Sequence, residues 1–280
     1  MNTITLEKAI ELAPAIGSNK PSSKVSDKYQ FVSSRQILES VQAHKWHIVG
    51  VKSMSQSPFA QHRVTLIHEN DLHTDTNSEG IMRIEMFNSH NLTKRLMFAV
   101  GFFRFVCSNG LVVASGPAET LKLKHRFNQD KLNEIMEHVG NMSQRFPNVL
   151  EKIQGFKSRE LKDQEQLAYA KFALMGKFRY RPSIPHKFAN LEKSAEMLLQ
   201  PRREEDKGNS TWQVYNRIQE NIIKGLEGAF RPVRGYTDEV RINQLLWKGA
   251  EITIEKKESS LDSEFKSLLL KDGKKGKISS

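Results

Sequence analysis

The chain has 280 residues and a mass of 32.1 kDa, a length that suits one large domain or two small ones, and its 38% apolar residues are enough for a hydrophobic core. It has no run of the roughly 18 consecutive apolar residues that a membrane helix needs, no secretory signal pattern, and a single cysteine, Cys107, which excludes an intramolecular disulfide framework and a cysteine-based zinc finger; we therefore expect a soluble, cytoplasmic protein. Lys and Arg number 43 against 32 Asp and Glu, so the net charge is +11 and the pI about 9.6, a balance typical of proteins that bind nucleic acids.

The composition divides the chain into four parts. Residues 1–27 are predicted to be a flexible N-terminal segment, because their second half is rich in Ser, Lys, Pro and Gly. Residues 28–127 have the pattern of a β-rich core unit, and residues 128–270 that of a helical region, which we expect to pack on the same core. Residues 271–280 are predicted to be a disordered basic tail. The fold class is therefore α+β, with an N-terminal antiparallel β-rich unit followed by a helical C-terminal half.

The β-rich part begins with a short predicted helix at 34–41. In the segment 81–87, three apolar residues alternate with Arg83 and Glu85, which is the period-2 pattern of a strand with one buried face. Strands are predicted over 46–54, 61–69, 81–87, 111–113 and 120–124.

The helical part shows apolar residues at the spacing i, i+3, i+4, i+7. Ser210 and Gln213 form a capping-box pattern that predicts the start of a helix. Gly249 is predicted to end a helix that begins at Thr237. The charged stretch 201–209 is predicted to be a mobile loop. Helices are predicted over 128–142, 161–175, 189–199, 211–226, 237–247 and 261–270.

Basic residues interleaved with aromatic ones are the strongest functional signal. The stretch 171–190 contains no acidic residue, and its cations and rings alternate in a way that suits contacts to phosphates and stacking on bases. Such a stretch is equally compatible with a solvated charged face whose rings lie in the core. The candidate nucleic-acid-binding residues are Lys171, Lys177, Phe178, Arg179, Tyr180, Arg181 and Lys187, with a second group of Lys94, Arg95, Arg104, Lys122, Lys124 and Arg126.

A second candidate is a polar pocket around two clusters, Asn88-Ser89-His90 and Cys107-Ser108-Asn109-Gly110. The alternative is that the segment 88–110 has only a structural role, as a buried helix or strand pair with a tight Asn-Gly turn. The nine histidines show no metal-binding spacing such as H-x-x-x-H, so no metal and no cofactor are expected, and Cys107 is expected to be a buried structural thiol. The residues of this alternative pocket are His62, Asn88, His90, Cys107, Asn109 and His125.

These same residues carry a family resemblance. Asn88-Ser89-His90 and the run 101–112 (GFFRFVCSNGLV) resemble the phage- and plasmid-related domain-of-unknown-function family numbered nine-three-two, and further matches lie at 60–64 (AQHRV), 124–126 (KHR) and 212–217 (WQVYNR). The match extends from about residue 26 to residue 247. One departure is Asn91, where an acidic residue is common in the family, so a carboxylate role there does not carry over. The resemblance implies a mobile-element origin and a bacterial cytoplasm, and it implies no activity.

Two classes of function are compatible with these patterns. The leading hypothesis is a non-enzymatic DNA-binding protein of a phage or plasmid, with single-stranded DNA favoured, that acts in replication, recombination or protection of element DNA; a fold-level analogy to phage annealing proteins points the same way. The alternative is an anti-defence or enzymatic factor, metal-assisted or not, that uses the polar pocket, or an inhibitor of a host protein. No membrane partner is expected. The sequence does not decide whether the chain forms a homo-oligomer, because the apolar helices after Ser210 suit either a core or a subunit interface.

Overall fold

The computed structural model describes residues 2–26, 29, 31–74, 80–93, 96–103, 121–122, 133, 137, 146–179 and 191–275. The chain divides into two compact units, Met1–Phe146 and Pro147–Ser280. The sequence predicts the boundary between the β-rich and the helical part at residue 127, and it predicts that the two parts share one core. Within the described ranges, no helix combines the length and the apolar character needed to span a membrane.

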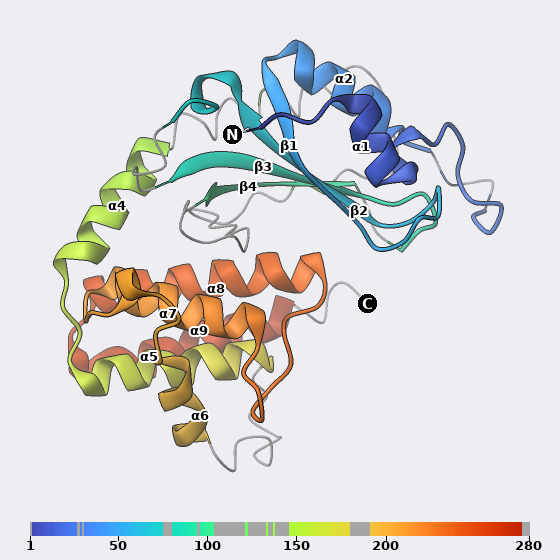
Figure 1. The fold of residues 1–280 in the computed structure, drawn as a ribbon. Helices are drawn as coiled ribbons and strands as arrows, with labels where there is room; N and C mark the ends of the chain where they lie inside the picture. Colours follow the sequence, from blue (N-terminus) through green and yellow to red (C-terminus); the bar gives the residue numbers. More distant parts are fainter. Residues whose placement is uncertain are drawn as a thin grey trace. The chain divides into compact units, whose positions relative to one another are not determined.

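The N-terminal unit is built on an antiparallel sheet (Figure 1). Its strands follow one another in chain order, each paired with the next, and the predicted α+β class is confirmed. The strand Met97–Phe103 falls in the segment 88–110, for which the sequence leaves a polar pocket and a buried helix or strand pair as alternatives. The strand predicted at 111–113 lies outside the described residues. The strands are β1 (Trp46–Ser53), β2 (His62–His68), β3 (Ile81–Asn88), β4 (Met97–Phe103) and the short β5 (Leu121–Lys122).

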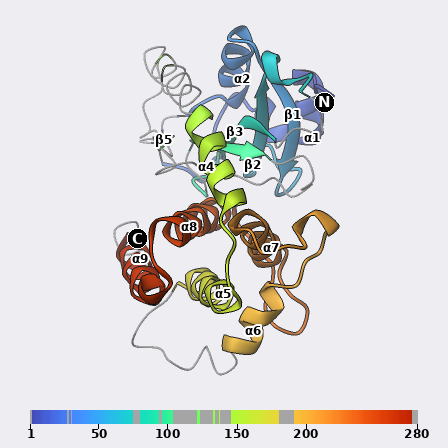
Figure 2. The ribbon, with the colours of Figure 1, turned by 90° about the vertical axis from the view of Figure 1, so that its left-hand side faces the viewer.

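One face of this sheet is covered by α1 (Leu6–Leu12), a 3₁₀ turn at Pro14–Gly17, and α2 (Ser34–Ala43), as Figures 1 and 2 show. Met82, Ile84 and Met86 of β3 point into the core between the sheet and these helices. The start of the chain belongs to this core as well, because Ala9 is fully buried and the Ile4 N–H donates to the Ile48 carbonyl at 2.7 Å. The expected flexibility of residues 1–27 is therefore corrected for residues 4–17, whose apolar side chains are held by α2 and β1.

The other face of β3 is also buried, which corrects the expectation of a half-buried strand. All eight residues of β3 are buried, including Arg83 and Glu85. The Glu85 carboxylate lies 2.8 Å from Nε of Arg83 and 3.6 Å from Nε of Arg63, and it accepts a hydrogen bond from the Thr65 hydroxyl at 3.0 Å. Burial of a carboxylate is tolerated where such partners replace water, and alternation in the sequence does not reveal these partners.

The C-terminal unit is helical. Its helices are α4 (Phe146–Ser158), α5 (Asp163–Lys177), α6 (Leu191–Leu198), α7 (Thr211–Lys224), α8 (Tyr236–Glu255) and α9 (Leu261–Lys275). Its core is aromatic: Phe172 of α5 stacks on Phe265 of α9 with ring centroids 4.6 Å apart, and Trp247 of α8 meets Phe156 of α4 edge-on at 4.8 Å. Figure 2 shows α5, α7, α8 and α9 nearly end-on and side by side.

Three expectations about this unit are corrected. Helix α8 continues through Gly249 to Glu255, because that glycine serves close packing rather than a helix end. Helix α9 extends to Lys275, so the first half of the expected disordered tail is helical. The stretch 201–209 is anchored rather than free: Arg203 forms an ion pair with Glu220 at 3.0 Å, and Arg202 donates to Asn221 at 2.5 Å. The helix expected over 128–142 lies almost entirely outside the described residues.

Candidate functional site

The C-terminal end of α5 meets the loop that joins α7 to α8. Lys177, the last residue of α5, donates from Nζ to the carbonyl oxygens of Ile222 and Arg231, each at 2.8 Å. Its ammonium also lies 4.5 Å from the centroid of the Phe230 ring, within the range of a cation–π interaction. Partial burial lowers the pKa of Lys177 to about 8, which still leaves the ammonium mostly charged at pH 7. Lys177 therefore fixes the loop against the helix.

The loop itself is a tight reversal. Gly225 follows α7 with a φ of +77°, and Gly228 has a φ of +73°, values that glycine adopts without steric cost. A Cβ atom on Gly225 would lie 2.5 Å from the backbone nitrogen of Pro232. The N–H groups of Phe230 and Val233 donate to Leu226 and Ile223 at 3.0 Å each. The backbone that carries Arg231 and Arg234 is thus held on both sides.

An aromatic ring and several guanidinium groups lie on the surface at this junction. Phe178 is 39% exposed and packs edge-to-face on Phe230, with centroids 6.2 Å apart. Arg179 has a left-handed φ of +53° and an ion pair with Asp238 at 2.5 Å. Arg231 and Arg234 are exposed, and their side chains have no partner among the described residues. We call Lys177, Phe178, Arg179, Phe230, Arg231 and Arg234 the basic-aromatic surface.

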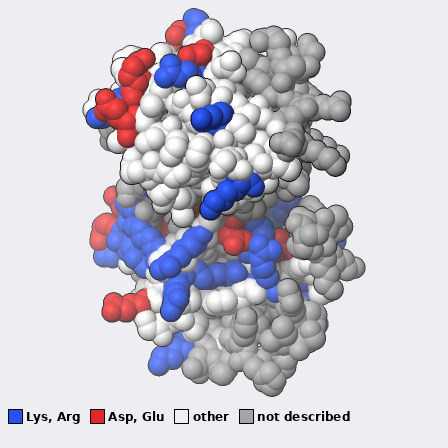
Figure 3. Space-filling view, turned by 90° about the vertical axis from the view of Figure 1, so that its right-hand side faces the viewer, with Lys and Arg blue, Asp and Glu red and all other residues white. Residues whose placement is uncertain are grey.

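The charge around this surface can be followed in the figures. The C-terminal end of α5 and the α7–α8 loop lie on the right-hand side of the helical unit in Figure 1, the side that faces the viewer in Figure 3. On that side of the unit, Lys and Arg side chains gather and outweigh Asp and Glu side chains (Figure 3). This distribution attracts polyanions.

The other predicted nucleic-acid contacts are placed less favourably or not described. Lys171 forms an ion pair with Glu192 of α6 at 3.0 Å, so its charge is partly neutralised. Lys122 lies in β5, in the N-terminal unit. Residues outside the described part of the chain are Tyr180, Arg181, Lys187, Lys94, Arg95, Arg104, Lys124 and Arg126. Sequence reasoning missed Arg231 and Arg234; the signal that points to them is the pair of arginines in RPVR, placed in a glycine-rich stretch immediately before a helix.

In the N-terminal unit, the structure brings together three residues of the alternative pocket. His62 Nδ1 lies 3.1 Å from the Ala60 carbonyl oxygen and must donate to it, so Nε2 is an acceptor. The Ser34 hydroxyl, 2.8 Å away, donates to this Nε2, and Asn88 Nδ2 donates to the Ser34 oxygen at 2.9 Å. Asn88, Ser34 and His62 thus form a directed chain of hydrogen bonds in which His62 is neutral.

His90 completes this buried cluster. Its Nε2 donates to the Ala15 carbonyl at 2.9 Å, and its ring centroid lies 5.6 Å from that of His62. Its buried Nδ1 has no hydrogen-bond partner among the described residues. Burial lowers the pKa of both histidines to about 4, opposed by their backbone hydrogen bonds, and a charge on His62 further lowers that of His90. Both side chains are fully buried, so the arrangement suits a structural role. The other members of the predicted pocket, Cys107, Asn109 and His125, lie outside the described residues.

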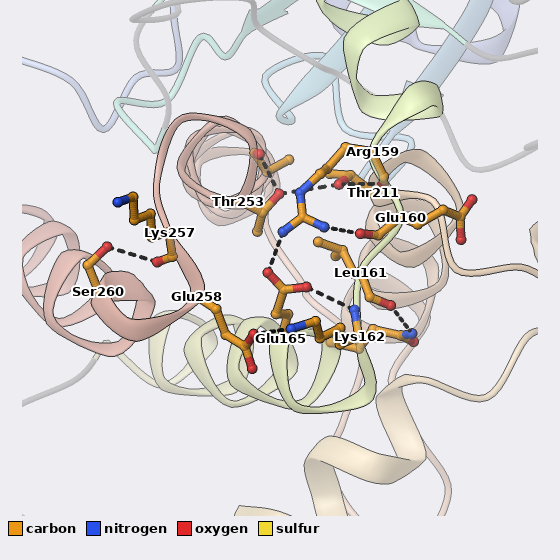
Figure 4. A network of polar contacts seen from close by, with 12 residues as sticks. Arg159, Glu160, Leu161, Lys162, Glu165, Thr211, Thr253, Lys257, Glu258 and Ser260 are labelled. Atoms are coloured by element: carbon orange, nitrogen blue, oxygen red, sulfur yellow. Dashed lines mark hydrogen bonds and ion pairs between the residues drawn. The ribbon is translucent and has the colours of Figure 1, made fainter.

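A third polar network ties the helical unit together (Figure 4). The Arg159 guanidinium contacts the buried Glu165 carboxylate, which also accepts from the Lys162 N–H at 2.9 Å and so caps the start of α5. The Lys162 ammonium reaches Glu258 at 2.8 Å, and the Thr211 hydroxyl donates to the Arg159 carbonyl at 3.2 Å. These contacts join the start of α5 to α7 and to the 3₁₀ turn at Glu258–Ser260 that precedes α9. Over the residues that the structure describes, no group of three or more His, Cys, Asp or Glu side chains is arranged to hold a metal ion.

Comparison with known proteins places the chain in a family. A profile described as "Domain of unknown function (DUF932)" matches residues 21–247. The chain belongs to this family. It is 28% identical over 262 residues to UPF0380 protein YafZ of Escherichia coli (strain K12), and equally to UPF0380 protein YfjQ of the same organism; each alignment covers 89% of this chain and 90% of the relative. No significant match to a solved structure is found.

The structure shows where the described family-like segments of this DUF932 protein lie. Asn88 and His90 are in the core of the N-terminal unit. Trp212 and Tyr215 stack with centroids 5.6 Å apart in the core of the helical unit, and Asn216 donates to the Trp212 carbonyl at 2.7 Å. These side chains lie in the cores of the two units and are not accessible to a ligand at the surface.

Proposed function

We propose that this protein is a non-enzymatic nucleic-acid-binding protein that takes up single-stranded DNA on the basic-aromatic surface. The observation that carries the proposal is the exposed ring of Phe178, which precedes Arg179 just after α5 and packs on Phe230 of the α7–α8 loop, the loop that also carries Arg231 and Arg234. Cations that follow phosphates around a ring that stacks on bases are the common design of sequence-tolerant single-strand binding. The net charge of +11 supports a polyanionic partner.

A single strand is favoured over a duplex because of the ring. A stacked base pair offers its edges in the grooves and keeps its faces covered, whereas an unpaired base can place its face on an aromatic side chain. Phe178 is held edge-to-face by Phe230, so its position is fixed before DNA binds. The Lys177 contacts to the loop keep Arg231 close to this ring, which lowers the entropy cost of ordering the site.

The biological setting that we propose comes from the family resemblance. A phage- or plasmid-encoded protein of this kind works in the cytoplasm of the bacterial host, where it serves replication, recombination or protection of mobile-element DNA. The two buried histidines of the N-terminal unit support the non-enzymatic part of the proposal, because a catalytic group has to reach its substrate.

The test is fluorescence anisotropy with a labelled 30-mer, single-stranded and duplex, over a series of salt concentrations. We expect tighter binding of the single strand and a steep salt dependence. In an Arg231→Gln, Arg234→Gln double variant, the slope of log K against log salt should fall by about 1.4, since each lost phosphate contact removes about 0.7. Phe178→Ala should weaken binding by about 5- to 150-fold, the equivalent of about 1–3 kcal/mol for one stacked base.

A matched control removes two charges elsewhere on the same unit. Lys193 of α6 and Lys266 of α9 are exposed and have no partner among the described side chains, so Lys193→Gln, Lys266→Gln should leave binding close to that of the unaltered protein. Equal losses in both double variants would mean that charge acts without a defined site. No binding of either DNA at low salt would overturn the proposed function.

A further inference from the structure

The N-terminal unit contains a pocket that neither the family nor the proposed function assigns. It has a volume of about 530 Å³, within the range of small-molecule sites. It lies where the segment after the 3₁₀ turn passes the loop between β1 and β2. Its lining residues are Lys20, Pro21, Ser22, Ser23, Val25, Ser26, Tyr29 and Phe59.

The pocket is framed by the two residues that follow β3. The His90 carbonyl accepts from the Ser22 N–H at 2.9 Å, and the His90 N–H donates to the Phe59 carbonyl at 3.1 Å. The Ser89 carbonyl accepts from the Tyr29 hydroxyl at 3.3 Å. Since the His90 side chain is itself fixed in the core by its bond to Ala15, three lining residues are attached to a rigid support. The Ser89-His90 step therefore shapes the pocket through its backbone.

The polar part of the lining is suited to an anion. The Lys20 ammonium and the hydroxyls of Ser23 and Ser26 have no partner among the described residues. The Ser22 oxygen accepts from the Lys24 N–H at 3.3 Å, which leaves its own hydrogen available for donation. No carboxylate is present in the described lining. One cation with several hydroxyl donors is the chemistry that binds a phosphate group.

The remaining lining is apolar and aromatic. Phe59 and Tyr29 contribute rings, and Pro21 and Val25 add aliphatic surface. A planar, weakly polar group gains from contact with such rings, and a free inorganic ion leaves them unused. A nucleotide combines a phosphate with a planar ring and so matches both parts of the lining.

We propose that this pocket binds one nucleoside 5′-monophosphate unit, with the phosphate at Lys20, Ser23 and Ser26 and the base against Phe59 and Tyr29. The unit has two sources with the same chemistry, a free mononucleotide and the 5′-phosphorylated end of a DNA strand. The pocket and the basic-aromatic surface share no residue, so each can fail without the other.

The test uses isothermal titration calorimetry of the full chain with adenosine 5′-monophosphate, adenosine and inorganic phosphate. We expect the monophosphate to bind at least tenfold more tightly than either fragment. Lys20→Met and the double variant Ser23→Ala, Ser26→Ala should each weaken this binding at least tenfold. Lys24→Met is the matched control, since Lys24 is an exposed lysine of the same segment that does not line the pocket, and it should bind as the unaltered protein does.

A second arm separates the two sources. A 12-mer that begins with adenosine and carries a fluorescent label at its 3′ end is compared with and without its 5′-phosphate by direct fluorescence anisotropy. Preference for the phosphorylated strand that is lost in Lys20→Met, without binding of the free monophosphate, assigns the pocket to strand ends. Tight binding of the free monophosphate assigns it to mononucleotides. The proposal is overturned if neither probe binds, or if the pocket variants bind both as tightly as Lys24→Met does. The Arg231→Gln, Arg234→Gln variant should bind the monophosphate normally, whatever its affinity for long DNA.

Discussion

The Lys177 ammonium donates to the backbone carbonyl of Arg231 at 2.8 Å, across 54 positions of the chain. The same ammonium donates to the Ile222 carbonyl in the last turn of α7, where a cation interacts favourably with the helix dipole. The sequence suggests Lys177 as a phosphate contact, but its three N–H donors are largely committed within the protein. We therefore assign it a positioning role, in which it holds Arg231 beside Phe178.

Replacing Lys177 by methionine tests this role. Lys177→Met keeps much of the aliphatic stem and removes both hydrogen bonds, so the free energy of unfolding of the helical unit should fall by about 1–3 kcal/mol. The amides of Phe230 and Val233 should exchange faster in hydrogen-exchange mass spectrometry. Lys171→Met, on the same helix, breaks only an exposed ion pair and should change stability by less than about 1 kcal/mol. Unchanged exchange in the loop of Lys177→Met would contradict the positioning role.

The histidine pair predicts how stability depends on pH. The folded-state pKa of His62 and His90 is about 4, against about 6.5 for a histidine in water, so protons bind the unfolded chain more readily. The stability from the neutral rings is fully present above pH 6.5 and declines as the pH falls toward 4, by up to about 1.4 kcal/mol per pH unit for each histidine.

Urea unfolding at pH 7 and pH 5, monitored by hydrogen exchange of the amides in β1–β3, measures how the free energy of unfolding changes with pH. Either His62→Gln or His90→Gln should reduce this change, and His44→Gln, which replaces an exposed histidine on α2's C-terminal side, should not. An N-terminal unit equally stable at both pH values would show that the two rings are not buried in neutral form.

Ser34 links Asn88 to His62 by hydrogen bonds, so we expect its replacement to lower the stability of the N-terminal unit. Ser34→Ala removes the donor to His62 Nε2 and one of the two acceptors of the Asn88 amide, which keeps its bond to the Val32 carbonyl at 3.3 Å. The buried His62 Nε2 left without a partner should cost about 1–3 kcal/mol. Ser40→Ala is the matched change on α2, because Ser40 is less buried and its side chain has no hydrogen bond among the described residues; it should be neutral or slightly stabilising. Similar unfolding midpoints for the two variants would argue against the hydrogen-bond chain.

Patterns between near neighbours predicted most elements of the fold. The strands expected at 46–54, 61–69 and 81–87 match β1, β2 and β3 within a residue or two, because alternation is set by the pleat itself. The Ser210–Gln213 capping box begins α7 as expected. Such signals depend on residues a few positions apart, so they survive without knowledge of the tertiary structure.

What depends on distant partners was not predictable in this way. Lys177 is held by backbone carbonyl oxygens. Because every residue has such an oxygen, the sequence does not indicate which ones Lys177 contacts. The polar run at Asn88-Ser89-His90 suggests an accessible pocket, yet Asn88 and His90 are buried, where the Ser34 hydroxyl and the Ala15 carbonyl accept their hydrogen bonds. Composition predicts residues 1–27 to be flexible, yet apolar side chains within 4–17 are buried against the sheet and α2.

Gly249 illustrates the same limit and yields a last prediction. The residue sits inside α8, where a Cβ atom would lie 2.5 Å from a ring carbon of Phe172 and 2.7 Å from one of Tyr169. Gly249→Ala should therefore destabilise the helical unit by about 1–3 kcal/mol through overpacking. At Gly155 of α4 the added Cβ meets only Ile254, at an ordinary 3.7 Å, so Gly155→Ala should stabilise by up to about 1 kcal/mol. Thermal unfolding of the two variants should shift in opposite directions; a gain in stability for Gly249→Ala would mean that the two rings can move aside and that the glycine is not required for packing.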